Sequence, residues 1–409
     1  MPVTIVHAAD LHIDSPLRGL SAYPGAPAEE IRGATRRAFE NVVELSERLH
    51  ADLVVIAGDV FDGTWTDFNT GLFFVQQLQR LHDSGIRTVI VHGNHDAESL
   101  ITNRLRLPAS ARALEAEAPE TVVFEDIGVA VHGQSYAQRA VRSDLAAAYP
   151  APIAGLFNVG LLHTALDGRA DHDNYAPCSL ATLRRRGYDY WALGHVHTRE
   201  VVATEPWVVF PGNVQGRHAR ETGAKGVTVV TVSDSGEATV EEVVLDSVRW
   251  AALRVDVTAC RNVDDVLERV LPEVESAEAA AGGRLLAARV VLEGRSEAAG
   301  ALIAAEDHLA AEIRALSMRF ARVWVEQVRV EARRPSWGPD VAGPEVAGVA
   351  AALRDDTEGL RALFADLAAK VPPELREACD PPLFSQAWLA ERAAEAEELL
   401  GARLSEAMR

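Results

Sequence analysis

The chain has 409 residues, of which 48% are hydrophobic and 24% charged, a composition typical of globular proteins that excludes a disordered chain. Because single domains usually hold about 100–200 residues, we expect two or three domains. The 40 Lys and Arg residues against 60 Asp and Glu residues give a net charge of −20, which argues against attraction of nucleic acid by the whole surface. Any DNA contact must therefore be local, assisted by metal ions or shared with a partner.

The first 245 residues alternate short apolar runs with longer amphipathic stretches, a pattern typical of strands buried between layers of helices. Helices are predicted over residues 31–49 and 72–81, where apolar residues recur at three- or four-residue spacing. Strands are predicted over residues 3–9, 53–58, 88–91, 159–162, 188–193, 206–211 and 227–232. The pattern predicts an α/β sandwich, and we place its domain at residues 1–245.

The rest of the chain has a different layout. Residues 246–333 read as strand, helix, strand, helix and strand, with helices over 263–271 and 299–316, and predict a separate small α+β domain. Residues 334–344 contain three prolines and two glycines and predict a linker. Two amphipathic stretches predict a helical C-terminal region over residues 345–409.

Signals for secretion or membrane insertion are absent from the sequence. The N-terminus lacks a basic start followed by an apolar stretch, and no run of 18 apolar residues occurs. The three cysteines show no spacing typical of metal or redox sites. We therefore expect a cytoplasmic, non-membrane protein with reduced cysteines.

Five polar clusters stand where apolar strands end. They are Asp10-Leu11-His12, Gly58-Asp59, Gly93-Asn94-His95-Asp96, His163 and Gly194-His195-Val196-His197. Because ligands bind beyond the carboxyl ends of strands in an open α/β sheet, we expect these clusters to meet in one crevice. Asp, Asn and His donors without Cys fit manganese, iron or zinc in a catalytic site, and not calcium or a structural thiolate site.

The spacing within the clusters also favours a pair of metal ions. Alternate residues of an extended segment point the same way, so both members of Asp10-x-His12, or of His195-x-His197, can face the same two ions. Two ions about 3.5–4 Å apart can activate water and neutralise the phosphate under attack, and they require a bridging carboxylate. We assign the bridge to Asp59, which follows the most apolar strand. A lone His163 would more often be a core residue, so the prediction depends on the ordered set.

This ordered set of motifs resembles the calcineurin-like metallophosphoesterase superfamily. Within it, His-Ala-Ala-Asp-Leu-His-Ile-Asp-Ser-Pro at 7–16 and Pro-Gly-Asn-Val-Gln-Gly-Arg-His at 211–218 resemble the YhaO branch of SbcD-type DNA-repair exonuclease subunits. The resemblance covers residues 1–245 and implies two divalent ions, with manganese preferred over iron or zinc. It implies one ion held by Asp10, His12, Asp59 and His197, and the other by Asp59, Asn94, His163 and His195.

The resemblance also implies roles for neighbouring residues. His95 would lie over the scissile phosphate and protonate the leaving oxygen or stabilise charge, and Asp96 would orient it. Related nucleases can carry a second histidine three residues after the bridging aspartate, where this chain has Asp62. Asp62 could instead orient a ligand or cap the next turn. Arg217 and His218, in the second signature loop, are candidates for phosphate or DNA contact, against a structural role in that loop.

The same resemblance implies partners. Residues 246–333 resemble the capping domain that shapes the DNA path, and the C-terminal helices resemble segments that dock an SMC-like ATPase of the SbcC or YhaN type. We also expect a homodimer. Helices of this composition also pack on their own chain or on a second copy of it, so the ATPase is an interpretation of the resemblance.

The leading prediction is a two-metal-dependent DNA exonuclease or endonuclease that hydrolyses phosphodiester bonds in DNA repair, as the nuclease subunit beside an ATPase. One alternative is a calcineurin-like phosphatase or cyclic-nucleotide phosphodiesterase on a small substrate, which the metal cluster alone does not exclude. Another is a DNA-tethering assembly subunit whose metal cluster is structural.

Overall fold

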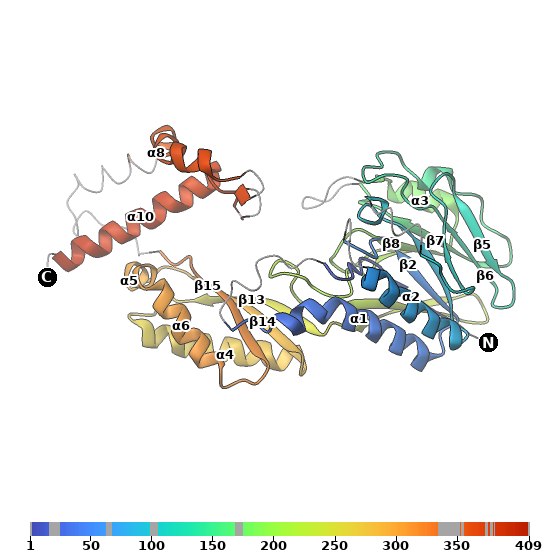
Figure 1. Cartoon of the computed structure of the whole chain (residues 1–409), viewed down its shortest axis with the longest axis horizontal. Coiled ribbons are helices and arrows are strands. Elements are labelled where there is room, and N and C mark those ends of the chain that lie inside the picture. Colours follow the sequence, from blue (N-terminus) through green and yellow to red (C-terminus); the bar gives the residue numbers. More distant parts are fainter. Residues whose placement is uncertain are drawn as a thin grey trace. The chain divides into compact units, whose positions relative to one another are not determined.

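The computed structural model describes residues 2–15, 25–62, 68–98, 105–167, 175–333, 352, 356–372, 375–376, 379 and 381–407. The chain divides into two compact units, coloured along the sequence in Figure 1. The large unit is Met1–Trp250 with Arg284–Leu286, and the small unit is Ala251–Gly283 with Ala287–Arg409. The linker predicted over residues 334–344 lies outside the described residues.

The large unit contains two six-stranded sheets. The first has the order β12-β11-β1-β2-β3-β4 and the second the order β5-β6-β7-β8-β10-β9. In the first, β1 to β4 are parallel and β11 and β12 antiparallel to their neighbours; in the second, β6, β7, β8 and β10 are parallel. The strands of the first sheet are β1 (Val3–Ala8), β2 (Leu53–Ala57), β3 (Arg87–Val91), β4 (Ala111–Ala113), β11 (Gly226–Val232) and β12 (Ala238–Val244). Those of the second are β5 (Glu120–Phe124), β6 (Val129–Gly133), β7 (Phe157–His163), β8 (Tyr190–Gly194), β9 (Glu200–Thr204) and β10 (Trp207–Phe210).

The apolar runs of the central strands are continuous because each strand faces two cores. On β2, Val54 and Ile56 pack beneath helices α1 (Ala28–Leu49) and α2 (Phe68–Asp83), whereas Val55 packs against residues of the second sheet such as Val159. Successive side chains of a strand point to opposite faces, so each face has its own layer of contacts. Trp191 and other residues of the second sheet pack on its outer side with α3 (Leu180–Arg186). The predicted α/β sandwich is confirmed.

The small unit begins with a three-stranded sheet in the order β13-β14-β15. Its strands are β13 (Val248–Asp256), β14 (Leu285–Glu293) and β15 (Val323–Val330), and its helices are α4 (Val263–Ala281), α5 (Ala299–Ala304) and α6 (Glu306–Ser317). The helix predicted over 263–271 continues to Ala281 and ends at Gly282, which has a left-handed φ of 60°. The helix predicted over 299–316 is interrupted at Ala305.

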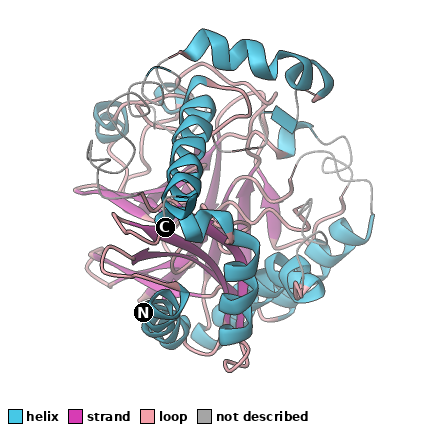
Figure 2. Cartoon of the chain, turned by 90° about the vertical axis from the view of Figure 1, so that its left-hand side faces the viewer, coloured by secondary structure: helices cyan, strands magenta, loops and turns pink. Residues whose placement is uncertain are grey.

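Two more helices follow in the small unit, α8 (Thr357–Lys370) and α10 (Gln386–Ala407), and α10 packs on α5 and α8. The rings of Phe364, Phe384 and Trp388 meet between them, with Phe364 and Trp388 centroids 5.2 Å apart. Figure 2 distinguishes the helices from the strands by colour. Among the described helices, none is both long and apolar enough to cross a bilayer.

Candidate metal centre

The carboxyl ends of strands from both sheets deliver the predicted ligands to one place. Asp10 and His12 follow β1, Asp59 follows β2, and His163 is the last residue of β7. Backbone hydrogen bonds continue beyond the strands, from Asp10 N–H to the Gly58 carbonyl and from His12 N–H to the Asp59 carbonyl, both at 3.0 Å. The segments after β1 and β2 are therefore held together at the site.

Left-handed backbone conformations concentrate among these residues. Asp10, His12, Asp59 and His195 have φ values of 50°, 44°, 50° and 97°. Non-glycine residues adopt positive φ at a cost of about 1–3 kcal/mol, and such strain typically occurs at functional sites. These backbone conformations turn the chain sharply at each residue whose side chain faces the cluster.

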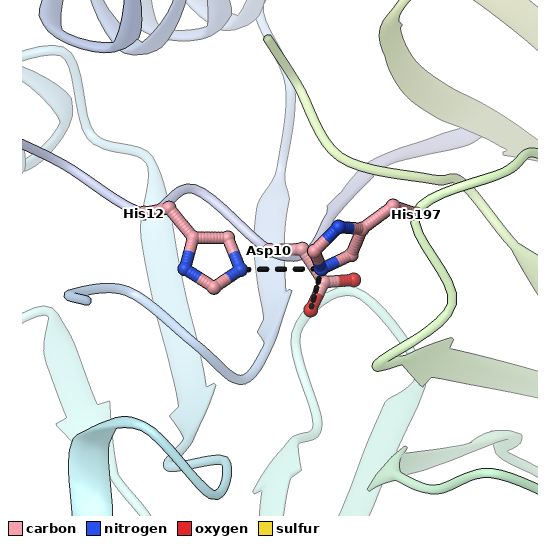
Figure 3. Close-up of side chains that lie close together, drawn as sticks. All are labelled: Asp10, His12 and His197. Carbon is pink, nitrogen blue, oxygen red and sulfur yellow. Dashed lines mark hydrogen bonds and ion pairs between the residues drawn. The ribbon is translucent and has the colours of Figure 1, made fainter. Parts of the chain in front are cut away.

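One group of donors consists of Asp10, His12 and His197. The His12 and His197 rings approach at their Nε2 atoms, 3.2 Å apart, and an Asp10 carboxylate oxygen lies 3.9 Å from His197 Nε2 (Figure 3). One donor atom from each of the three residues lies within 4.8 Å of the others. Three donors that face one another in this way match part of a divalent-metal coordination sphere.

A second group consists of Asp59, His163 and His195, whose donor atoms also lie within 4.8 Å of one another. His163 Nε2 is 3.3 Å from Asp59 Oδ2 and 3.0 Å from the side-chain oxygen of Asn94. The structure thus brings together all seven residues predicted as ligands, in two groups. Whether Asp59 bridges two ions stays a prediction.

The charges and donors of the cluster fit divalent cations. Burial raises the pKa of Asp10 and lowers that of His12 to about 3, so His12 is neutral and able to ligate at neutral pH. Burial opposes a charge on His163, yet the adjacent Asp59 carboxylate raises the pKa of His163 to about 9. His12 Nδ1 is buried, and the Asp62 Oδ1 atom lies 3.6 Å from it, just beyond hydrogen-bond distance. A buried carboxylate beside imidazoles is stabilised by positive charge, and a bound divalent cation can supply that charge in place of the protons on the carboxyl and imidazole groups.

Glycines make room for the cluster. A Cβ atom on Gly93 would lie 2.3 Å from Asp59 Oδ1 and 2.8 Å from His163 Cε1. A Cβ atom on Gly194 would lie 1.8 Å from the Ala57 carbonyl oxygen. Any larger residue at these positions would displace the donors or the strand end. Gly93 and Gly194 therefore let the backbone approach the cluster closely.

His95 lies at the edge of the cluster, with 31% of its side chain exposed and its ring 5.1 Å from that of His12. The carboxylate beside it is that of Asp62, whose Oδ1 is 3.0 Å from His95 Nδ1. Burial disfavours the charged imidazole, yet the hydrogen bond with Asp62 raises the pKa of His95 above its usual value. Of the roles considered for Asp62, the structure favours orientation of a neighbouring histidine.

Asp96, which we expected to orient His95, contacts the backbone instead. Its carboxylate accepts the N–H groups of Val60, Phe61 and Gly93 at 2.9–3.1 Å. It thereby joins the loop after β2 to the loop after β3, at the start of the short 3₁₀ helix Asp96–Glu98. The described contacts of Asp96 support Asp59 and Asn94 through their loops, and the His95 ring is oriented by Asp62.

Two residues that sequence reasoning missed hold His197. The Glu221 carboxylate lies 2.7 Å from His197 Nδ1, and the Lys225 ammonium donates to the His197 carbonyl at 2.7 Å. Such outer contacts fix the ring of a ligand and are needed for metal affinity. Arg217 is nearly buried between Glu221 and Asp62, whereas 48% of the neighbouring His218 side chain is exposed. Nothing in the spacing along the sequence indicates these pairings.

Comparison with known proteins agrees with this site. Residues 3–199 match the family model of the calcineurin-like phosphoesterases, and residues 250–333 match the model of the middle domain of metallophosphoesterase YhaO. The uncharacterized metallophosphoesterase YhaO of Bacillus subtilis is 34% identical over 296 residues, which are 71% of this chain and 72% of that protein. The chain belongs to the YhaO family of calcineurin-like metallophosphoesterases.

Relatives with lower identity include two proteins named DNA double-strand break repair protein Mre11. That of Methanopyrus kandleri is 29% identical over 217 residues, which are 47% of this chain and 44% of that protein. That of Saccharolobus solfataricus is 26% identical over 202 residues, 48% of this chain and 50% of that protein. A solved dimetal phosphatase from Danio rerio aligns with 60% of this chain and 99% of its own at 10% identity, with a TM-score of 0.33.

Membership of this family confirms the resemblance found in the sequence motifs and identifies a hydrolase of phosphoester bonds. Metallophosphoesterases use a dinuclear metal centre, and among the described residues of this YhaO-family chain three groups of donors could hold a metal ion. They are the two groups around Asp10 and Asp59 and a third group of His12, Asp62 and His95.

Proposed function

We propose that this metallophosphoesterase is a DNA nuclease that hydrolyses phosphodiester bonds in DNA repair and uses manganese in preference to iron or zinc. The observation that carries the proposal is the pair of buried donor groups with the partly exposed His95 beside them. The similarity to the two Mre11 proteins supports DNA as the substrate over a small phosphoester.

In the proposed site, one ion is held by Asp10, His12, Asp59 and His197, and the other by Asp59, Asn94, His163 and His195. When bound, the two ions supply Lewis-acid activation of the phosphate and of the attacking water.

His95 Nδ1 is occupied by Asp62, which leaves Nε2 to donate a proton to the sugar oxygen as its bond to phosphorus breaks. The raised pKa of His95 favours the protonated ring that this step requires. We place Asp96 among the residues that support the site through the backbone, and we assign phosphate contact to the exposed His218.

We further propose the larger assembly. Residues 1–245 would be the nuclease domain, 246–333 a capping domain beside the DNA path, 334–344 a linker and 345–409 a docking region. The partner would be an SMC-like ATPase of the SbcC or YhaN type, and the nuclease would be a homodimer in the cytoplasm. Exposed Leu363 and Leu367 on α8 support docking, because both present apolar surface on one side of a helix. A partner would also supply the DNA attraction that a net charge of −20 does not.

The test uses end-labelled linear DNA and bis(p-nitrophenyl) phosphate, each with manganese, magnesium, zinc or chelator. Asp59→Ala removes the proposed bridge, and Asp126→Ala is the matched control, because Asp126 is an exposed carboxylate paired only with Arg87 among its described contacts. We expect manganese-dependent degradation of DNA that Asp59→Ala abolishes and Asp126→Ala retains. Hydrolysis of the small diester with indifference to DNA would instead identify a small-substrate phosphodiesterase.

A further inference from the structure

Arg217 contacts two carboxylates through its backbone and side-chain donors, and its Nη2 also lies 3.4 Å from His197 Nδ1. Its backbone N–H donates to Glu221 Oε2 at 2.7 Å, and its side chain reaches the same carboxylate through Nε at 3.4 Å and Nη2 at 3.1 Å. Its Nη1 lies 3.5 Å from Asp62 Oδ2. Because 13% of the Arg217 side chain is exposed, this guanidinium is enclosed by the carboxylates that it pairs with.

The same two carboxylates contact the Nδ1 atoms of His197 and His95, and Asp62 Oδ1 also lies 3.6 Å from His12 Nδ1. Glu221 Oε1 lies 2.7 Å from His197 Nδ1, and Asp62 Oδ1 lies 3.0 Å from His95 Nδ1. The opposite nitrogen of His197, Nε2, faces His12 in the first donor group. A carboxylate on Nδ1 fixes both the tautomer and the direction in which Nε2 points. The two rings are therefore oriented by carboxylates that share one cation.

A direct contact with substrate phosphate would disrupt this arrangement. Bidentate binding of phosphate uses two parallel guanidinium N–H groups, and those of Arg217 already face Glu221 and Asp62. Withdrawing the guanidinium would leave two carboxylates near each other in a partly buried site without their counter-charge. A lysine at this position could not replace the planar fork that reaches both sides.

We infer that Arg217 is a positioning residue, which clasps Asp62 and Glu221 and thereby orients His95 for proton transfer and His197 for metal binding. We name Asp62, Arg217 and Glu221 the carboxylate clasp. The inference rests on the proposed function for the role of His95, whereas the link from Arg217 to His197 is tested by metal binding alone.

The experiment compares Arg217→Gln and Arg217→Lys with Arg289→Gln. Arg289 donates through Nε and Nη2 to Glu326, at 3.0 Å each, within the small three-stranded sheet. Arg289→Gln therefore removes a partly buried Arg–Glu ion pair away from the metal centre and is the matched control. Manganese affinity of the full-length chain is measured by calorimetry, and kcat and KM are measured with bis(p-nitrophenyl) phosphate at saturating manganese. Thermal melting reports folding.

The clasp predicts that Arg217→Gln lowers manganese affinity by about 10–100-fold, as loss of an outer-shell contact does, and lowers kcat with KM nearly unchanged. Arg217→Lys keeps the charge but loses the planar guanidinium, so its manganese affinity and kcat should lie between those of Arg217→Gln and wild type. Arg289→Gln should keep wild-type manganese affinity and kcat. If Arg217→Gln does not fold, Arg217→Lys carries the test, with a manganese affinity below that of wild type expected.

Unchanged manganese affinity and kcat in the folded Arg217 variants, with a KM raised tenfold or more, would overturn the inference and identify Arg217 as a phosphate contact. A wild-type chain that binds manganese but hydrolyses neither DNA nor the diester would contradict the proposed function. In that case, the affinity of Arg217→Gln still decides whether the clasp holds His197.

Discussion

Replacing Gly93 with alanine should disable the candidate metal centre through a single methyl group. Gly93 has no left-handed φ, so alanine is compatible with its backbone and the effect is steric. The new Cβ would lie 2.3 Å from Asp59 Oδ1, about 1 Å short of the 3.4 Å at which ordinary contact begins. Asp59 has little freedom to retreat, because it is 1% exposed and its Oδ1 accepts the His95 N–H at 2.9 Å.

The expected cost follows from this geometry. Overpacking by a methyl group destabilises a folded protein by about 1–3 kcal/mol. A displacement of about 1 Å in a reacting group lowers the rate by roughly 100-fold. Because the same Cβ would also meet the His163 ring at 2.8 Å, both a carboxylate and an imidazole of the second donor group would move.

The assay measures manganese affinity, diester hydrolysis and the free energy of unfolding for Gly93→Ala and for Gly33→Ala. A Cβ on Gly33, within helix α1, meets nothing within 4 Å. Gly33→Ala should therefore stabilise the chain by about 0.5–1 kcal/mol and leave activity unchanged. Wild-type manganese affinity and kcat in Gly93→Ala would refute the reasoning, because the donors would then tolerate a shift of about 1 Å.

Three further predictions follow from individual contacts. Glu221→Gln should weaken manganese binding by about 10–100-fold, because Glu221 holds the His197 ring. Glu242→Gln, which breaks a more exposed ion pair with Arg199, should leave manganese binding intact. Equal manganese affinities of the two variants in calorimetry would contradict the role of Glu221. Asp62→Asn should lower kcat on the diester by about 100-fold or more with little change in KM, and a wild-type kcat would exclude orientation of His95 by Asp62. Burial lowers the pKa of His7 to about 3, so below about pH 6.5 the unfolded chain binds a proton that the folded chain excludes. Stability from His7 is therefore full above pH 6.5 and decreases by about 1.4 kcal/mol per pH unit towards pH 3. Urea unfolding of His7→Gln should show a weaker pH dependence in that window, and an unchanged slope would count against the buried neutral ring.

Much of the large unit could be predicted from the sequence because its central strands are buried on both faces. Such strands appear as continuous apolar runs, and the helices that cover them have clear amphipathic spacing. Strands β4, β5, β6, β9 and β12 were not predicted. β4 has three residues, and β5, β9 and β12 are edge strands whose partly exposed side chains interrupt the apolar pattern. β6 is fully buried, but it reads Val-Ala-Val-His-Gly, and its histidine and glycine end the apolar run after three residues.

The meeting of the seven candidate ligands could also be predicted, because parallel strands end at the same edge of a sheet. The partners of their rings could not. Asp62 and Glu221 contact His95 and His197 through loops, whose course depends on tertiary contacts and shows no periodicity along the chain. Asp96 illustrates the same limit, since adjacency to His95 in sequence suggested a contact that its backbone hydrogen bonds replace.

Metal binding at the two donor groups also depends on how far the chain has folded. His12 and His197 stand 185 residues apart in sequence, and their rings meet only after β1 of the first sheet and β8 of the second have docked. An unfolded or half-assembled chain would therefore lack the assembled donors, and ions would bind selectively to the finished fold. By mass action, each tenfold excess of free metal over its Kd should add about 1.4 kcal/mol to the stability of the native state. The supply of metal in the cell would then set both the activity of this protein and its lifetime.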